Sequence, residues 1–199
     1  MHKNIITADF DGTLTTKDTL LEFIRYARGT WGLLWGFLLH SPLLVLMKLR
    51  LYPNYRAKQR IFSYYFRGMT LEAFDSLCQR FARDNRDRLL RQDGLAMLRR
   101  ALDDGAQVLI VSASIDNWVR PFFEGMAVTI LGTQVETKGG LLTGCFLTAN
   151  CYGPEKVRRI KAELKESRDH YHITAFGDSR GDKEMLDYAD EGYYKPFRH

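Results

Sequence analysis

Two aspartates stand directly behind the first apolar run of this 199-residue chain. Residues 5–8 read Ile-Ile-Thr-Ala, and Asp9, Asp11 and Gly12 follow them. Because side chains alternate along a strand, both carboxylates project to one side of its end, and glycine lets the backbone turn sharply there. Close carboxylates repel each other unless a cation joins them, and Mg²⁺ prefers such hard oxygen ligands. The segment predicts a buried strand ending in a magnesium site; the alternative is an ordinary Asp-Gly turn without chemistry.

Three more polar segments follow along the chain, and two of them again end apolar runs. Ser112 follows the run 108–111, Lys156 follows the residues Gly-Pro-Glu, and Asp178 and Asp182 follow a second apolar run. In open parallel sheets the connecting loops and helix N-termini converge at the carboxyl ends of the strands. We therefore expect these residues to meet the aspartate pair at one edge of a sheet.

Together these segments resemble the motifs of the haloacid dehalogenase superfamily of phosphatases, and most closely its phosphoserine-phosphatase-like branch (subfamily IB). The resemblance covers the core motifs and is looser elsewhere. It implies an α/β fold, with a doubly wound, mainly parallel, Rossmann-like sheet as the core and an inserted α-helical cap. The core is expected in residues 1–14 and 91–199, and the cap in residues 15–90.

The resemblance also implies roles for the acidic residues. Asp9 is expected to be the nucleophile that forms an aspartyl-phosphate. Asp11 is expected to protonate the departing alcohol, then to take a proton from the incoming water. Mg²⁺ is expected to be held by the carboxylates of Asp9 and Asp178 and by the backbone carbonyl of Asp11. Asp182 is interpreted as a supporting acid, and a solvated loop carboxylate is the alternative for it.

The remaining candidate residues carry donors for a phosphoryl group. The Ser112 hydroxyl and the Ala113 backbone N–H are expected to donate to phosphoryl oxygens, although a serine at a strand end often makes only local hydrogen bonds. Ser114 is a weaker candidate for the same task. Lys156 occupies the position of the family's lysine, where its ammonium is expected to contact both Asp9 and the phosphoryl group.

The rest of the chain alternates between strand-like and helix-like segments. Residues 15–90 are helix-like, with breaks at Gly29, Pro42, Pro53 and Gly68. A Lys-Gly-Gly sequence at residues 138–140 predicts a hairpin turn. We expect further strands at residues 108–112, 128–131, 172–176 and 192–196, and helices at about 94–104 and 154–167.

The stretch of residues 31–47, from Trp31 to Met47, is apolar and has no formally charged residue. Pro42 divides it, which makes it marginal as a membrane span, because a spanning helix needs about 20 apolar residues. Our first expectation is two short cap helices packed against the core. The alternative is an interfacial hairpin that contacts an anionic membrane peripherally, flanked by Arg25, Arg28, Lys48 and Arg50.

The amino-acid composition limits the cellular compartment and the partners that we expect for the protein. A hydrophobic content of 45% supplies enough apolar material for a packed interior. The three cysteines, Cys78, Cys145 and Cys151, have no metal-binding spacing, which favours a reducing compartment. The formal net charge of +5 suits an acidic substrate, but Lys and Arg are scattered, so no nucleic-acid partner is expected. Because the first strand begins almost at the N-terminus, we expect no signal peptide and a cytoplasmic location, with membrane association as the alternative.

These observations favour a Mg²⁺-dependent phosphatase that hydrolyses a small phosphorylated substrate, a phosphomonoester, through an aspartyl-phosphate. Because the cap is apolar, a lipid-phosphate phosphatase acting at a membrane surface, on a substrate like phosphatidylglycerophosphate, is the alternative. A non-catalytic module that binds a membrane or a partner is a second alternative.

Overall fold

The computed structural model describes residues 2–49 and 51–198. Five strands form the main sheet, in the order β3-β2-β1-β6-β7, and all four pairings are parallel. The strands are β1 Lys3–Ala8, β2 Gln107–Ile115, β3 Val128–Thr133, β6 Tyr171–Gly177 and β7 Glu191–Tyr194. The predicted α/β fold with a mainly parallel sheet is confirmed.

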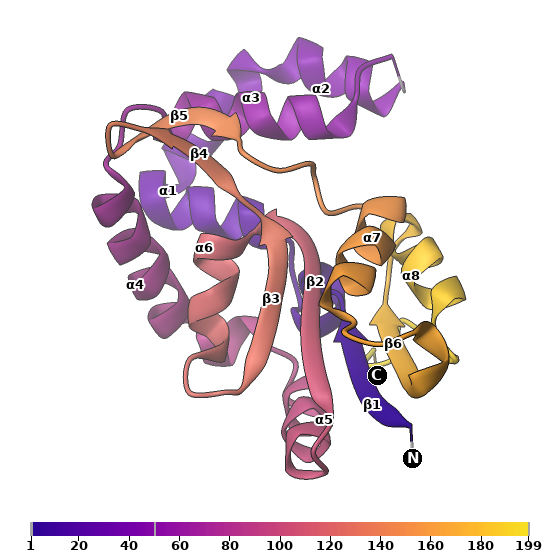
Figure 1. Ribbon diagram of the computed structural model, residues 1–199. Coiled ribbons are helices and arrows are strands. Elements are labelled where there is room, and N and C mark those ends of the chain that lie inside the picture. Colours follow the sequence, from indigo (N-terminus) through magenta and orange to yellow (C-terminus); the bar gives the residue numbers. More distant parts are fainter. Residues whose placement is uncertain (1, 50, 199) are drawn as a thin grey trace.

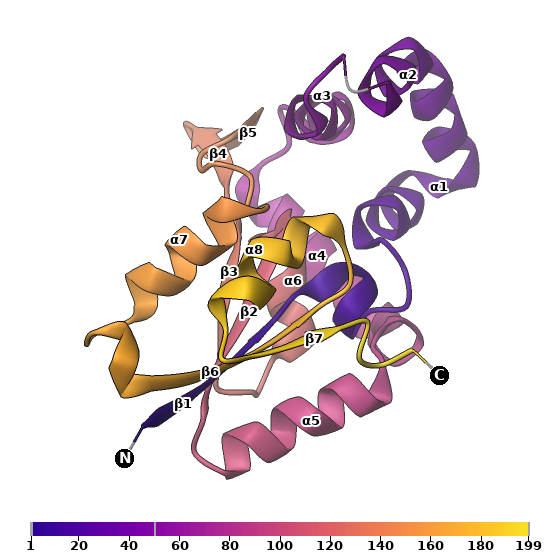
Figure 2. The same ribbon diagram turned by 90° about the vertical axis from the view of Figure 1, so that its right-hand side faces the viewer.

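Helices cover both faces of this sheet (Figure 2). Side chains of β2 alternate between two apolar cores: Val108 and Ile110 belong to one, Leu109 and Val111 to the other. Such burial on both faces explains why the strand reads as a continuous apolar run. The first core includes side chains of α5 Gln92–Asp103 and α6 Asp116–Val119, and the second those of α7 Pro154–Glu163 and α8 Lys183–Tyr188.

Four of the five helices between β1 and β2 form an insertion; the first three lie at the carboxyl ends of the strands, and the fourth lies beside α6 (Figure 1). The four are α1 Thr19–Leu39, α2 Ser41–Lys48, α3 Asn54–Phe66 and α4 Leu71–Leu89. An antiparallel bridge between Thr15 and Leu90 closes the insertion at its base. Phe23 of α1 packs against Phe66 of α3 and Phe81 of α4, so aromatic contacts hold these helices together.

A short antiparallel hairpin lies beside the inserted helices (Figure 1). It consists of β4 Val135–Lys138 and β5 Leu141–Phe146, and the Lys-Gly-Gly turn joins them as predicted. Leu141 forms a bridge with Thr70, and the backbone N–H of Gly68 donates to the carbonyl of Leu142 over 2.9 Å. The hairpin is thus fixed against the helical insertion, although it comes from a later part of the chain.

Four short helical turns complete the described structure. In addition, the helix predicted at residues 154–167 is shorter than expected. The turns are η1 Phe10–Leu14, η2 Arg120–Phe123, η3 Arg168–His170 and η4 Arg180–Asp182. The prediction of a helix through residue 167 is wrong, because α7 ends at Glu163 and Leu164 is extended. The backbone N–H groups of Lys165 and Glu166 instead donate to the Tyr171 hydroxyl, over 3.0 and 3.1 Å.

The expectation that residues 31–47 pack against the core holds only for part of the stretch, because Leu33 and Leu44 are half-buried against the first core. The stretch does form two helices, but α2 has no buried residue, and Trp31 and Trp35 are 84% and 65% exposed. Of the four expected flanking cations, Arg50 lies outside the described residues. No single described helix has the length and apolar composition of a membrane span; α1 and α2 meet those measures only as a pair bent by 65°.

Candidate active site

The polar segments singled out in the sequence meet in one cavity of about 510 Å³. It lies between the carboxyl ends of the strands and the inserted helices. Asp9 follows β1, Ser112 lies on β2, Lys156 lies in the first turn of α7, and Asp178 follows β6. The cavity wall includes all the predicted site residues: Asp9, Asp11, Ser112, Ala113, Lys156, Asp178 and Asp182.

The turn after β1 brings the two central acidic segments close together. The backbone N–H of Asp9 donates to the carbonyl of Phe176 on β6 over 2.9 Å, so the two strand ends are tied. Gly12 has a φ of +79°, a conformation that other residues rarely adopt. A Cβ at this position would lie 2.5 Å from Oδ2 of Asp178. Only glycine therefore lets the turn approach this carboxylate so closely.

Lys156 is a buried cation at the centre of the site, only 2% exposed. Its Nζ donates to Oδ1 of Asp9, Oδ1 of Asp182 and the carbonyl oxygen of Val111, each over 2.6 Å. These three acceptors match the three N–H groups of an ammonium. To contact a phosphoryl group, Lys156 must therefore give up one of these three hydrogen bonds. We interpret its main role as holding the Asp9 carboxylate in place.

Burial and charge set the protonation of the acids around Lys156. Burial raises the pKa of Asp9 to about 7, although the Lys156 ammonium opposes the shift. For Asp182 burial also favours the neutral form, but the Lys156 ammonium and hydrogen bonds from Ser179 outweigh it and lower the pKa. Asp182 is thus the more acidic of the two carboxylates that Lys156 contacts, whereas burial brings the pKa of Asp9 close to neutral pH.

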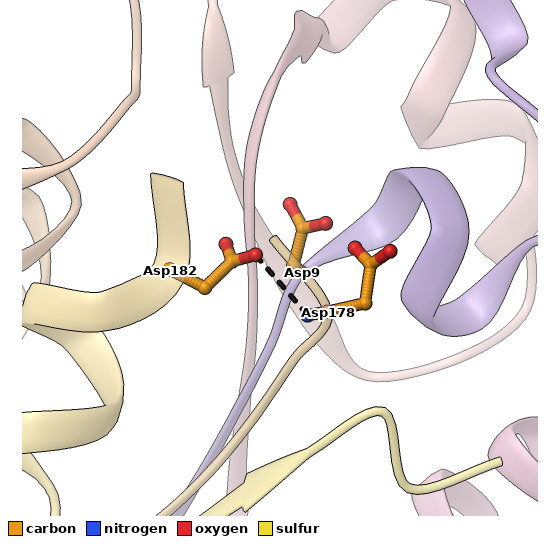
Figure 3. A group of neighbouring side chains, drawn as sticks. All are labelled: Asp9, Asp178 and Asp182. Atoms are coloured by element: carbon orange, nitrogen blue, oxygen red, sulfur yellow. Dashed lines mark hydrogen bonds between the residues drawn. The ribbon is translucent and has the colours of Figure 1, made fainter. Parts of the chain in front are cut away.

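Asp9, Asp178 and Asp182 form a carboxylate cluster in which one oxygen from each lies within 4.8 Å of the others (Figure 3). Asp182 is already engaged, because Oδ2 accepts from the backbone N–H groups of Asp178 and Ser179 over 3.2 and 2.9 Å. Its other oxygen binds Lys156. The cluster fits a hard divalent cation, with Asp9 and Asp178 as the carboxylates to hold it and Asp182 as their support.

Mg²⁺ binding to this cluster is expected to strengthen as the pH rises to about 7 and then to level off. Below that pH a cation must displace the proton from Asp9, whose pKa burial raises to about 7, so the apparent Kd should fall about tenfold per pH unit. Calorimetric titration of the cation-free protein in buffers of different ionisation enthalpy would measure both the affinity and the released proton. Affinity independent of pH between 5 and 7, without proton release, would contradict this.

Asp11 points toward the inserted helices and is held by two donors. Its Oδ1 accepts from the backbone N–H of Thr19, at the start of α1, over 2.7 Å. Its Oδ2 accepts from the Ser114 hydroxyl. The backbone N–H of Ser114 donates in turn to Oγ of Ser112 over 3.0 Å. Ser114, considered in the sequence only as a weak phosphate donor, is therefore placed to orient both Asp11 and Ser112.

Lys58 is a cation in the cavity that sequence reasoning missed. It lies on α3, and its Nζ donates to the carbonyl oxygen of Ala113 over 2.5 Å, so it links the inserted helices to β2. Burial lowers the pKa of Lys58, although the carboxylates of Asp11 and Asp18 oppose the shift. No sequence signal separates Lys58 from Arg56 and Arg60, its neighbours on α3, because only the placement of this helix over the cavity distinguishes it.

Arg198 is a second cation that the sequence did not indicate. Its guanidinium contacts Oδ2 of Asp178, and the Thr13 hydroxyl donates to Oδ1 of Asp178 over 3.3 Å. The segment is anchored by Phe197, whose ring stacks on Phe176 with 5.5 Å between centroids. Burial raises the pKa of Asp178, and Arg198 opposes that shift.

Comparisons with known proteins identify the family of the chain. The sequence model of the haloacid dehalogenase-like hydrolases matches residues 6–187. Protein CicA of Caulobacter vibrioides is 33% identical over 203 residues, which cover 99% of this chain and 88% of CicA.

Two solved structures have the same fold at low sequence identity. A protein of unknown function from Bordetella pertussis Tohama I has a TM-score of 0.82 at 17% identity, over 94% of this chain and 87% of its own. A phosphoserine phosphatase, solved as an analogue of its phospho-aspartyl intermediate, has a TM-score of 0.60 at 18% identity, over 98% of this chain and 86% of its own. The chain belongs to the haloacid dehalogenase-like hydrolases, and its fold is that of the phosphoserine-phosphatase-like branch.

Proposed function

We propose that this hydrolase is a Mg²⁺-dependent phosphatase that cleaves a phosphomonoester through an aspartyl-phosphate on Asp9. The observation that carries the proposal is the position of Asp9. Its carboxylate is held by Lys156 over 2.6 Å, lies within the acidic cluster and lines the cavity between the sheet and the inserted helices. A fixed carboxylate beside a cation site is what in-line attack on phosphorus requires.

In the first half of the proposed reaction, an oxygen of Asp9 attacks phosphorus and the bond to the alcohol oxygen breaks. Asp11, oriented by Thr19 and Ser114, gives its proton to the leaving oxygen. In the second half, Asp11 takes a proton from water, which attacks the phosphoryl group, restores the Asp9 carboxylate and releases phosphate. Mg²⁺, held by Asp9 and Asp178, would supply positive charge beside the phosphoryl oxygens.

Strand β2 and the inserted helix α3 supply the rest of the site in this proposal. The Ser112 hydroxyl is positioned by Ser114, and its hydrogen can be donated to a phosphoryl oxygen. The α3 helix closes over β2 through the bond between Lys58 and Ala113, which restricts water beside the phosphoenzyme.

Phosphate release from a panel of monoesters tests the function. Phosphoserine, sugar phosphates, nucleotides and para-nitrophenyl phosphate would each be offered with MgCl₂ and with EDTA. Hydrolysis of at least one monoester that requires MgCl₂ is expected. The absence of Mg²⁺-dependent hydrolysis across the panel would overturn the proposal and favour a non-catalytic binding module.

A lipid phosphomonoester is a second candidate substrate, favoured by the wall of the cavity. Phe37 of α1 and Leu44 and Met47 of α2 line the same cavity as Asp9. An apolar wall beside a phosphate site suits an acyl chain, as in a substrate like phosphatidylglycerophosphate. Dihexanoyl phosphatidic acid, offered below its critical micelle concentration, tests whether this apolar wall binds acyl chains in the absence of a membrane. A kcat/KM below that of phosphoserine would rule the lipid preference out.

A Lys58→Met variant is expected to raise KM for the preferred monoester about tenfold, with a smaller change in kcat. The reason is that Lys58 offsets the negative charge of Asp11 and Asp18 in the cavity, so its loss weakens anion binding. Steady-state kinetics would measure the effect. Arg60→Met, an exposed change on the same helix, is the matched control and should leave KM unchanged. Equal KM values for the two variants would contradict a role for Lys58 in substrate binding.

A further inference from the structure

The second half of α1 has apolar side chains on two opposite sides. Trp31, Leu34, Trp35 and Leu38 follow the three-and-four spacing of one helix face, and all four are exposed. Leu33, Gly36, Phe37 and His40 have the same spacing two residues later, which places them on the opposite face. These four are buried or half-buried. An apolar stripe therefore faces solvent although another stripe of the same helix already packs inward.

Contacts on the inner stripe fix the outward direction of the outer one. The Tyr65 hydroxyl of α3 donates to the carbonyls of Gly32 and Leu33, each over 3.1 Å. A Cβ at Gly36 would lie 1.8 Å from this hydroxyl oxygen, so α1 and α3 meet too closely for any other residue. The His40 ring packs edge-on against Tyr64, with 5.1 Å between centroids. The helix cannot rotate to bury its outer stripe without losing these contacts.

The α2 helix extends the exposed surface. Val45 and Leu46 are 56% and 42% exposed, and α2 contains no buried residue. In both views the α1–α2 region lies at the end of the molecule opposite α5 (Figures 1 and 2). We call this surface the apolar tip, defined by Trp31, Leu34, Trp35, Leu38, Val45 and Leu46. Groups of exposed apolar side chains of this kind mark interaction sites.

The distribution of charged residues around the apolar tip indicates which kind of partner it binds. No Asp or Glu occurs between Glu22 and Glu72, whereas eight Lys or Arg residues do. Because the whole chain has a formal net charge of +5, the remainder carries −3. Arg25, Arg28 and Lys48 are exposed beside the tip. Two copies joined through this face would bring like charges together, whereas an anionic lipid surface complements both the charge and the apolar stripe.

We propose that the apolar tip docks on an anionic membrane surface, with both helices lying in the interface and the basic residues among the lipid headgroups. Tryptophan side chains are common at the membrane–water interface, because the ring is apolar and its N–H can stay near water. Phe37 and Met47 face the cavity from the inner side of the same helices, so docking places the cavity about 10 Å, one helix diameter, from the bilayer. The docking does not depend on the proposed phosphatase activity.

Vesicle sedimentation of the full chain tests the docking. Vesicles of equal parts phosphatidylcholine and phosphatidylglycerol would be compared with phosphatidylcholine alone, at low and high salt. Binding to the mixed vesicles is expected, and it should weaken at high salt. Trp31→Ser combined with Trp35→Ser should weaken binding at least about tenfold, because two large apolar side chains are lost. Leu147→Ser with Tyr194→Ser removes side chains that are 64% and 58% exposed elsewhere, and should bind as the wild type does.

Tryptophan emission adds an independent readout. Trp118 is fully buried, so a blue shift on addition of mixed vesicles reports Trp31 and Trp35. Three outcomes would overturn the proposal: no binding of the wild-type chain to mixed vesicles, undiminished binding of the double tryptophan variant, or a wild-type dimer that this variant converts to a monomer. Hydrolysis of para-nitrophenyl phosphate in the same samples separates the two proposals, because its absence with retained binding would refute only the phosphatase.

Discussion

Replacement of Asp9 by Asn is expected to lower kcat for any phosphomonoester by about 10⁴-fold or more and to remove the acid-stable phosphoenzyme. The amide keeps the size of the carboxylate, and its oxygen can still accept from Lys156, as Oδ1 of Asp9 does over 2.6 Å. It lacks the charged oxygen that would attack phosphorus. Single-turnover reactions with a labelled monoester, quenched in acid, would measure the phosphoenzyme directly.

The same substitution should stabilise the cation-free protein at high pH. Burial raises the pKa of Asp9 from 3.8 to about 7, so between these values the folded chain holds a proton that the unfolded chain has released. The stability of the wild-type chain therefore falls as the pH rises through this window, whereas Asn at position 9 does not titrate. Asp9→Asn should be the more stable protein at pH 8 in EDTA, and the difference should shrink toward pH 4.

Denaturant unfolding at several pH values, with Asp103→Asn as an exposed control, would measure the stability change. A variant that loses turnover but is less stable than the wild type at pH 8 would show that Asp9 matters for folding rather than for chemistry. Retained steady-state hydrolysis would reject the assignment of Asp9 as the nucleophile.

The site residues that follow apolar runs were predictable because sheet topology and the resemblance to the family's motifs both indicate them. Asp9, Ser112 and Asp178 each follow an apolar run, and in a parallel sheet such runs end at one edge. Lys156 follows a Gly-Pro pair that starts a helix, and it was chosen because this early position resembles that of the family's lysine. None of these inferences needs the side-chain packing of the inserted helices.

Lys58 and Arg198 were missed because their positions depend on that packing and on the course of the C-terminal segment. Nothing local in the sequence reveals which of several cations on α3 lies over the cavity. The exposed part of residues 31–47 was missed for a related reason. Both sides of the second half of α1 carry apolar side chains, Trp31 and Trp35 on one and Leu33 and Phe37 on the other, so the helical period does not show which side is covered. Only the contacts of Tyr65 with α1 decide it.

Replacement of Lys156 by Met is expected to reduce the free energy of unfolding by about 3–5 kcal/mol at pH 8 and to reduce turnover sharply. The side chain is only 2% exposed, and its loss leaves Asp9 and Asp182 as two close, buried carboxylates without a cation between them. Their mutual repulsion raises both pKa values, so the loss of stability should diminish as the pH falls and the carboxylates take up protons.

A control variant and a double variant test whether the loss of the positive charge causes the lower stability of Lys156→Met. Lys161→Met, on the exposed side of the same helix, should change stability by no more than about 0.5 kcal/mol. Adding Asp182→Asn to Lys156→Met should restore part of the lost stability, because one of the two repelling charges is removed. Denaturant unfolding of the wild type, both single variants and the double variant gives the coupling energy. Additive effects would mean that Lys156 supports the fold by packing rather than through its charge interaction with Asp182.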